Sequence, residues 1–134
     1  MSLFQNVSGA TARDCVIDDK MDRVIFVVNK GEMGLAIGRS GASIKNIQRM
    51  VGKPVELVEY SDDPNEFIRN SLSPKYVTDL RLTEKLDGTK IAVVVVDQRW
   101  KGAVVGKNGR NAEKARLLAR RYFQITNIHI VTQP

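Results

Sequence analysis

The sequence predicts an α+β protein built from two copies of one small module. Two continuous apolar runs, at residues 24–28 and 92–96, are typical of buried central strands. Each run is followed by a short apolar segment, a G-x-x-G turn and a segment with helical periodicity. A single offset of 68 residues relates Gly34 to Gly102, Gly38 to Gly106, Gly41 to Gly109, and residues 24–28 to residues 92–96. A shared offset of this kind indicates an internal duplication.

The composition is that of a globular protein. Hydrophobic residues make up 43% of the 134 residues and charged residues 27%. No apolar run is long enough to cross a bilayer, and the N-terminus lacks a secretory signal pattern, so we expect a cytoplasmic protein without a membrane partner. Cys15 has no second cysteine to pair with, and His129 alone completes no zinc site. We therefore expect no metal and no cofactor, and we place Cys15 in a buried strand.

The positive charge is concentrated in the second copy. The net charge is +6 with a pI near 9.7. Residues 1–60 hold 8 basic and 7 acidic side chains, whereas residues 61–134 hold 13 basic and 8 acidic ones. This excess lies around the second G-x-x-G turn, where glycines and a helix start would suit a phosphate. It therefore favours a nucleic-acid partner over an ordinary solvated surface.

The first copy is predicted to begin with a short helix and then to alternate strands and helices. Leu3, Phe4 and Val7 have helical spacing before Ser8-Gly9. The following predicted elements are strands at 14–18 and 23–29, helices at 31–37 and 42–51, and a strand at 54–60.

The second copy opens with a clear helix start, because Asp63 is a favourable N-cap and Pro64 fits the first helical position. Asp87-Gly88 predicts the turn of a hairpin. The predicted elements are a helix at 64–72, strands at 76–86 and 90–97, helices at 99–105 and 110–122, and a strand at 125–131. We therefore predict domains at 1–61 and 62–134, with residues 62–75 as a linking helix.

Each G-x-x-G turn is a candidate phosphate site. Its glycines permit close approach of another backbone, the following helix start offers free N–H groups, and Arg39 or Lys107 supplies a cation. The candidate nucleic-acid contacts are Gly38, Arg39, Ser40, Gly41, Lys45, Gly106, Lys107, Asn108, Gly109, Arg110 and Lys114. The aliphatic residues expected to line the adjoining groove are Ile37, Ile44, Val55 and Val105.

Several plainer interpretations compete with these assignments. The turns could be tight helix connections in which glycine serves geometry alone, but the duplication and the matching basic residues favour a binding role. Trp100 could stack on a nucleobase, although packing in the core or between the modules is the favoured prediction. His129 is predicted at an exposed strand position. The sequence before Asn108 resembles a P-loop but has three residues between its glycines instead of four, and no catalytic constellation stands out, so no enzyme is predicted.

Residues 37–47, Ile-Gly-Arg-Ser-Gly-Ala-Ser-Ile-Lys-Asn-Ile, resemble the signature of the KH domain, whose G-x-x-G loop clamps about four nucleotides. The second copy departs from that signature with Ala112 and Ala115 in place of isoleucines. Two such modules in tandem, together with the segments 31–38 and 58–64, resemble the NusA family, particularly its short archaeal form. The resemblance implies two tandem type II KH domains of order α-β-β-α-α-β, each a three-stranded mixed sheet with helices on one face. It places the leading helices at 1–10 and 64–72.

The resemblance also implies a function. It predicts a non-enzymatic protein that binds the single-stranded RNA of the nascent transcript and takes part in transcription termination or antitermination, with RNA polymerase as a further partner. We expect a monomer. Two alternatives stay open from the residues alone: an adaptor that docks on RNA polymerase or a ribonucleoprotein through its helices, and a protein whose ligand is single-stranded DNA.

Overall fold

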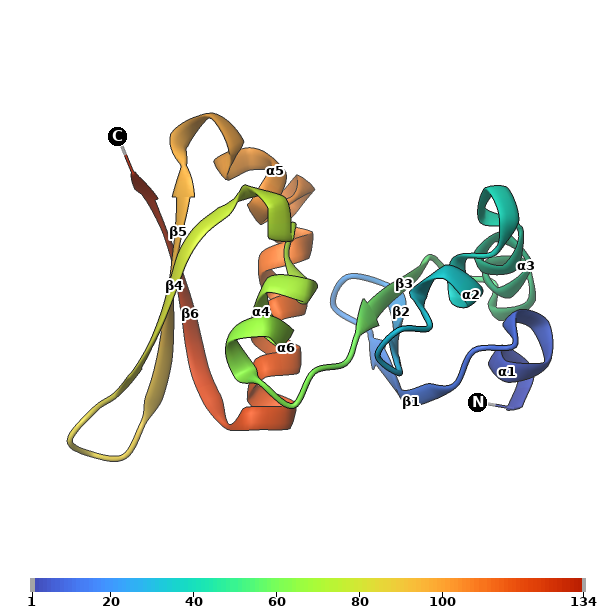
Figure 1. Cartoon of the computed structure of the whole chain (residues 1–134), viewed down its shortest axis with the longest axis horizontal. Helices are drawn as coiled ribbons and strands as arrows, with labels where there is room; N and C mark the ends of the chain where they lie inside the picture. Colours follow the sequence, from blue (N-terminus) through green and yellow to red (C-terminus); the bar gives the residue numbers. More distant parts are fainter. Residues whose placement is uncertain (1, 134) are drawn as a thin grey trace. The chain divides into compact units, whose positions relative to one another are not determined.

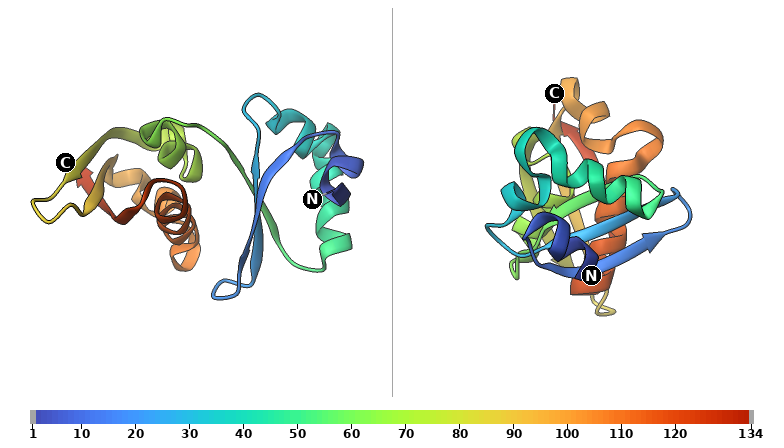
Figure 2. Two further views of the ribbon diagram at one scale, coloured as in Figure 1. Left: turned by 90° about the horizontal axis from the view of Figure 1, so that it is seen from below. Right: turned by 90° about the vertical axis from the view of Figure 1, so that its right-hand side faces the viewer.

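The chain forms two compact units, Met1–Tyr60 and Ser61–Pro134. The structure, a computed structural model, describes residues 2–133. Both units have the element order α-β-β-α-α-β, and in each the helices lie on one face of a three-stranded sheet (Figures 1 and 2). The expected α+β architecture is therefore present in both copies.

In the first unit the apolar run at residues 24–28 forms the central strand. The sheet order is β1-β2-β3, with β2 antiparallel to β1 and parallel to β3. All six residues of β2 are buried, as a strand with neighbours on both edges and covered faces requires. The elements are α1 (Ser2–Ser8), β1 (Ala12–Asp18), β2 (Arg23–Val28), α2 (Met33–Ile37), the 3-10 turn η1 (Arg39–Gly41), α3 (Ala42–Val51) and β3 (Val55–Glu59).

The core of the first unit lies between this sheet and its helices. Phe4 of α1 packs on Phe26 of β2 with ring centroids 4.5 Å apart, and Ile47 of α3 is fully buried beside them. Cys15 lies in β1 as expected but is only half-buried, and burial raises the pKa of its thiol. Val55 is 4% exposed and belongs to this core. Its predicted role in lining an open groove is wrong, because its register opposite Val24 turns it toward the helices.

The second unit repeats the topology with a longer last helix. The sheet order is β4-β5-β6, again with an antiparallel and a parallel pairing around the central strand. The C-terminal strand is longer than predicted. The elements are α4 (Pro64–Ser71), η2 (Pro74–Tyr76), β4 (Val77–Glu84), β5 (Lys90–Asp97), η3 (Gln98–Trp100), α5 (Lys101–Val105), η4 (Lys107–Gly109), α6 (Arg110–Phe123) and β6 (Ile125–Gln133).

Helix α4 begins as the sequence predicts. The carboxylate of Asp63 accepts a hydrogen bond from the backbone N–H of Asn65 at 3.1 Å, and Pro64 occupies the first turn. Ile68 of α4 joins Ala115 and Ala119 of α6 in the core above the sheet. Ala115 stands where the first copy has Ile47, and Ala119 where it has Val51. The smaller side chains let α6 lie close to its neighbours.

The first strand of each unit carries the same irregularity. The pairing register shifts between Ala12 and Asp14 in β1, and between Val77 and Asp79 in β4. In both, the aspartate accepts a hydrogen bond from the next backbone N–H, at 2.8 and 2.9 Å respectively. A bulge interrupts side-chain alternation, which is why the sequence placed the start of β1 two residues late. A hydrogen bond from Arg81 holds the pKa of Asp79 below its usual range.

Two further expectations are corrected by the structure. Trp100 is 41% exposed and lies outside the core of its unit, so its predicted place in the core is wrong, whereas packing between the modules stays a prediction. Lys114 is only 8% exposed, because it lies on the buried face of α6 with Leu118 one turn later. His129 is exposed in β6, as predicted. Among residues 2–133, no helix is long and apolar enough to span a membrane.

Candidate nucleic-acid interface

The two G-x-x-G loops, residues 38–41 and 106–109, have the same backbone conformation. Gly38 has φ 78° and ψ 173°, and Gly106 has φ 81° and ψ 164°. The third loop residue is left-handed in both: Ser40 has φ 54° and Asn108 has φ 58°. Gly41 and Gly109 follow with φ 75° and 78°. Each loop therefore places three residues with positive φ before a helix, and the duplication extends from sequence to geometry.

The first glycine of each loop is required by packing inside its unit. A Cβ on Gly38 would lie 2.7 Å from the backbone nitrogen of Ser43, and one on Gly106 would lie 2.9 Å from that of Asn111. Asn111 also donates a hydrogen bond from its side chain to the carbonyl of Ala103 at 3.3 Å. Ser43 and Asn111 are again 68 residues apart. The sequence analysis did not single them out, although the shared offset could have revealed them.

The second glycine faces open space. Nothing lies within 4 Å of a Cβ built on Gly109, and only ordinary contacts lie near one built on Gly41. Its positive φ favours glycine, and the missing side chain also leaves room for an incoming backbone. This side of each loop is the one that can accept a ligand.

Unpaired backbone donors accompany that open side. Within residues 2–133, the N–H groups of Arg39 and Ser40 donate no hydrogen bond, and neither do those of Lys107 and Asn108. A right-handed residue followed by a left-handed one directs successive N–H groups to one point, which is a nest for an anionic oxygen. The loop backbone can therefore hold a phosphate oxygen without any side chain.

The cations predicted at the loops are available in most cases. Arg39, Lys45 and Lys107 are exposed, and in the described part of the chain their side chains have no hydrogen bond or ion pair. Arg110 is half-buried and already has a partner. Lys114 is buried and partnered, so it does not belong to the open face of the second loop.

A second exposed glycine lies one turn before each loop. Gly34 in α2 and Gly102 in α5 are exposed, and no atom lies within 4 Å of a Cβ built on either. Glycine inside a helix costs about 1 kcal/mol of stability relative to alanine. Because an alanine side chain would fit at either position, packing within the unit does not explain why glycine is present. Gly102 and the neighbouring Ala103 are both exposed, so they form a side-chain-poor strip on α5, one turn before the second loop.

The apolar residues beside the loops partly match the expected groove. Ile37 is 41% exposed, and Ile44 and Val105 are half-buried. They can offer apolar surface to a nucleobase, whereas the buried Val55 cannot.

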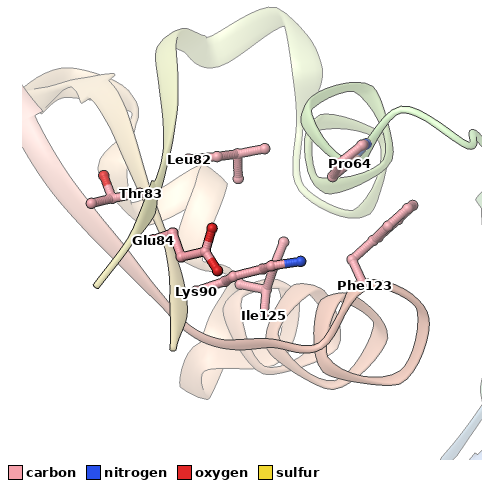
Figure 3. Close-up of a pocket in the computed structure, with 7 residues that line it drawn as sticks. All are labelled: Pro64, Leu82, Thr83, Glu84, Lys90, Phe123 and Ile125. Carbon is pink, nitrogen blue, oxygen red and sulfur yellow. The ribbon is translucent and has the colours of Figure 1, made fainter. Parts of the chain in front are cut away.

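A cleft of about 310 Å³ lies elsewhere in the second unit (Figure 3). Phe123, at the C-terminal end of α6, contributes to it, whereas the loop lies at the N-terminal end of the same helix. The 14 residues of α6 place the two features about 20 Å apart. The cleft is lined by Pro64, Leu82, Thr83, Glu84, Lys90, Phe123 and Ile125. It is therefore separate from the phosphate site.

No cluster of three or more metal-binding side chains occurs in residues 2–133. The chemistry that the loops offer is hydrogen bonding and charge neutralisation, directed at an anionic backbone.

Comparisons with known proteins agree with this geometry. Residues 1–69 match the family described as KH domain, and residues 64–133 match the NusA-like second KH domain. The chain is 38% identical to the probable transcription termination protein NusA of Halococcus morrhuae, over 97% of this chain and 91% of that one. It is 32% identical to the protein of the same name from Methanocaldococcus jannaschii, over 99% and 71% of the two chains.

The fold also matches a solved structure. The crystal structure of APE1850 superposes with a TM-score of 0.87 at 37% sequence identity, covering 97% of this chain and 94% of that one. With both KH families matched in tandem and relatives aligned over nearly the whole length, the chain belongs to the NusA-like family of tandem KH-domain proteins.

Proposed function

We propose that this protein is an RNA-binding transcription termination factor that holds single-stranded RNA through its two G-x-x-G loops. The observation that carries the proposal is the duplicated loop: an open nest of backbone N–H groups, beside an exposed and unpaired cation, occurs once in each unit. Phosphate contacts of this kind fix the position of a strand without reading its sequence.

The residues have distinct roles in this proposal. Gly38 and Gly106 set the loop conformation, and Gly41 and Gly109 let the sugar-phosphate backbone approach. Arg39, Lys45 and Lys107 neutralise phosphates, while Ser40 and Asn108 present their backbone N–H groups. Arg110, half-buried and next to Gly109, is the further RNA contact proposed at the second loop. Bases rest against Ile37, Ile44 and Val105.

The biological setting follows from the relatives, which bear the name of transcription termination proteins. In our proposal the RNA is the nascent transcript, the site of action is the cytoplasm, and RNA polymerase is a further partner. The protein acts by binding and carries out no catalysis. It works as a monomer with two domains, at 1–61 and 62–134, whose shared boundary lies within one residue of that between the two units.

The test replaces each loop in turn with acidic residues. The double variants R39D/S40D and K107D/N108D should each weaken binding of a labelled single-stranded RNA by about tenfold or more, because each loses charge-assisted phosphate contacts. Fluorescence anisotropy measures the affinity, and circular dichroism during heating checks the fold.

The matched control is K85D/L86D, which makes the same change in charge at the exposed tip of the β4–β5 hairpin (Figure 1). It should bind RNA much more tightly than either loop variant. Loop variants that bind as well as this control would remove the loops from the mechanism. A matched DNA oligomer that binds more tightly than RNA would instead identify single-stranded DNA as the ligand.

A further inference from the structure

An aromatic pair lies at the start of α5 in the second unit, with Trp100 exposed and Tyr76 half-buried. The rings of Tyr76 and Trp100 stack with centroids 4.7 Å apart and planes inclined by 19°. Trp100 remains 41% exposed in this arrangement. Large aromatic rings held flat at a surface offer a face for a further ring to stack on.

Cations surround this pair. The Nζ atom of Lys75 lies 4.9 Å from the Tyr76 ring centroid, and the Arg99 guanidinium carbon lies 6.0 Å from that of Trp100. Lys101, the next residue along the chain, is exposed. The opposing charge on these segments is Asp97, which accepts two hydrogen bonds from the Arg99 side chain at 3.2 Å each. Three cations against one carboxylate favour a ligand that is anionic as well as aromatic.

The first unit shows that the fold does not need this arrangement. The residue before β1 is Thr11, and the residue before α2 is Glu32, which are the positions of Tyr76 and Trp100 in the second unit. There the backbone N–H of Thr11 simply donates a hydrogen bond to the Glu32 carboxylate at 2.9 Å. The three cationic positions carry no charge in the first unit, where Ala10, Gly31 and Met33 replace Lys75, Arg99 and Lys101.

The pair also lies within reach of a strand bound at the second loop. Helix α5 separates Trp100 from Gly106 by five residues, or about 8 Å. A KH loop holds about four nucleotides, and such a stretch spans more than about 10 Å even at the helical rise of 3.4 Å per nucleotide. One continuous strand can therefore contact both features.

We propose that Tyr76 and Trp100 form a base-stacking platform, on which a nucleobase of the single-stranded RNA held by the second loop lies against the exposed part of the Trp100 ring. This rests on the proposed RNA-binding function and adds to it a contact with a base that the first unit lacks. Stacking on an aromatic ring accepts any base, so the platform increases affinity without selecting sequence.

Trp100 is the single tryptophan of the sequence, so its fluorescence reports directly on the platform. The experiment titrates the full chain with a mixed-sequence single-stranded RNA of about 12 nucleotides, longer than one loop requires, and separately with inorganic polyphosphate. We expect RNA to quench the fluorescence and polyphosphate, which has no bases, to leave it nearly unchanged.

Anisotropy titrations of variants test the same contact. W100A should lose about tenfold in RNA affinity, whereas W100F should retain most of that affinity. The control L86A, at another exposed residue, should bind RNA as the wild type does.

Two results would overturn the platform. One is equal RNA affinity for W100A and the wild type, and the other is an equal fluorescence change with polyphosphate and with RNA. Either would leave the loop double variants free to support the proposed function. If W100A does not fold, the wild-type titrations with RNA and with polyphosphate still decide. A wild-type chain that binds no RNA would refute the proposed function itself.

Discussion

At the scale of single residues, the loop glycines differ in what they do. Gly38 and Gly106 are held against the start of the next helix, whereas Gly109 and, one turn before the second loop, Gly102 face open space. The first kind is needed to fold the loop and the second kind is available to a ligand. Stability and RNA affinity should therefore respond to different substitutions.

Replacing Gly106 with alanine should destabilise the protein more than replacing Gly109. Both positions have positive φ, which costs a non-glycine residue about 1–3 kcal/mol. Gly106 adds a clash, because its new Cβ would lie 2.9 Å from the backbone nitrogen of Asn111. Urea denaturation followed by circular dichroism measures the difference. Equal midpoints for the two variants would show that the loop relaxes around the new methyl group.

Replacing Gly102 with alanine should separate stability from binding. The substitution removes a helix-interior glycine where nothing lies within 4 Å of the new Cβ, so the free energy of unfolding should stay the same or rise by up to about 1 kcal/mol. We expect the RNA strand held by the second loop to cross the strip at Gly102, so the added methyl group should lower RNA affinity. Anisotropy titrations provide the measurement, and an unchanged affinity would exclude the strip from the interface.

At the scale of elements, each helix is fixed by its ends and its buried face. A glycine in the left-handed αL conformation precedes both α3 and α6, whereas α4 begins at the side-chain cap that Asp63 provides. Helix α6 is four residues longer than α3 and buries small side chains. The buried face of α6 includes Lys114, together with Ala112, Ala115, Leu118 and Ala119.

Removing the cap of α4 should weaken the second unit. In D63A the backbone N–H of Asn65 loses its acceptor, which should cost about 1 kcal/mol. The neighbouring variant D62A is the control, because the side chain of Asp62 is exposed and caps nothing. Thermal unfolding of both variants measures the effect, and equal melting temperatures would show that water replaces the cap without loss.

At the scale of the whole molecule, the charge distribution governs association. The net charge of +6 arises mainly from residues 61–134. If about five phosphates are neutralised, RNA affinity should fall about a hundredfold between 50 and 200 mM salt. Anisotropy titrations at several salt concentrations give the slope, and K107D/N108D should make it shallower. A wild-type affinity independent of salt would argue against phosphate recognition.

The amino-acid sequence by itself determined the duplication, the central strands, the two loops and the cap of α4. These features follow from local backbone preferences, such as the positive φ of Gly41 and Gly109. They also follow from unbroken apolar runs, which indicate a buried strand without knowledge of the rest of the fold. Strand ends were less predictable where a bulge breaks alternation, as at Asp14.

Only the tertiary structure decided which side chains are covered. Val55 and Lys114 look available in the sequence but lie on buried faces, and Trp100 looks like a core residue but is exposed. The reason is that burial depends on neighbours distant along the chain: Trp100 stacks on Tyr76, which comes from the segment before β4, and no local pattern connects the two. The helices, strands and loops of each copy thus followed from local sequence, whereas the surface offered to RNA was set by contacts between segments far apart in sequence.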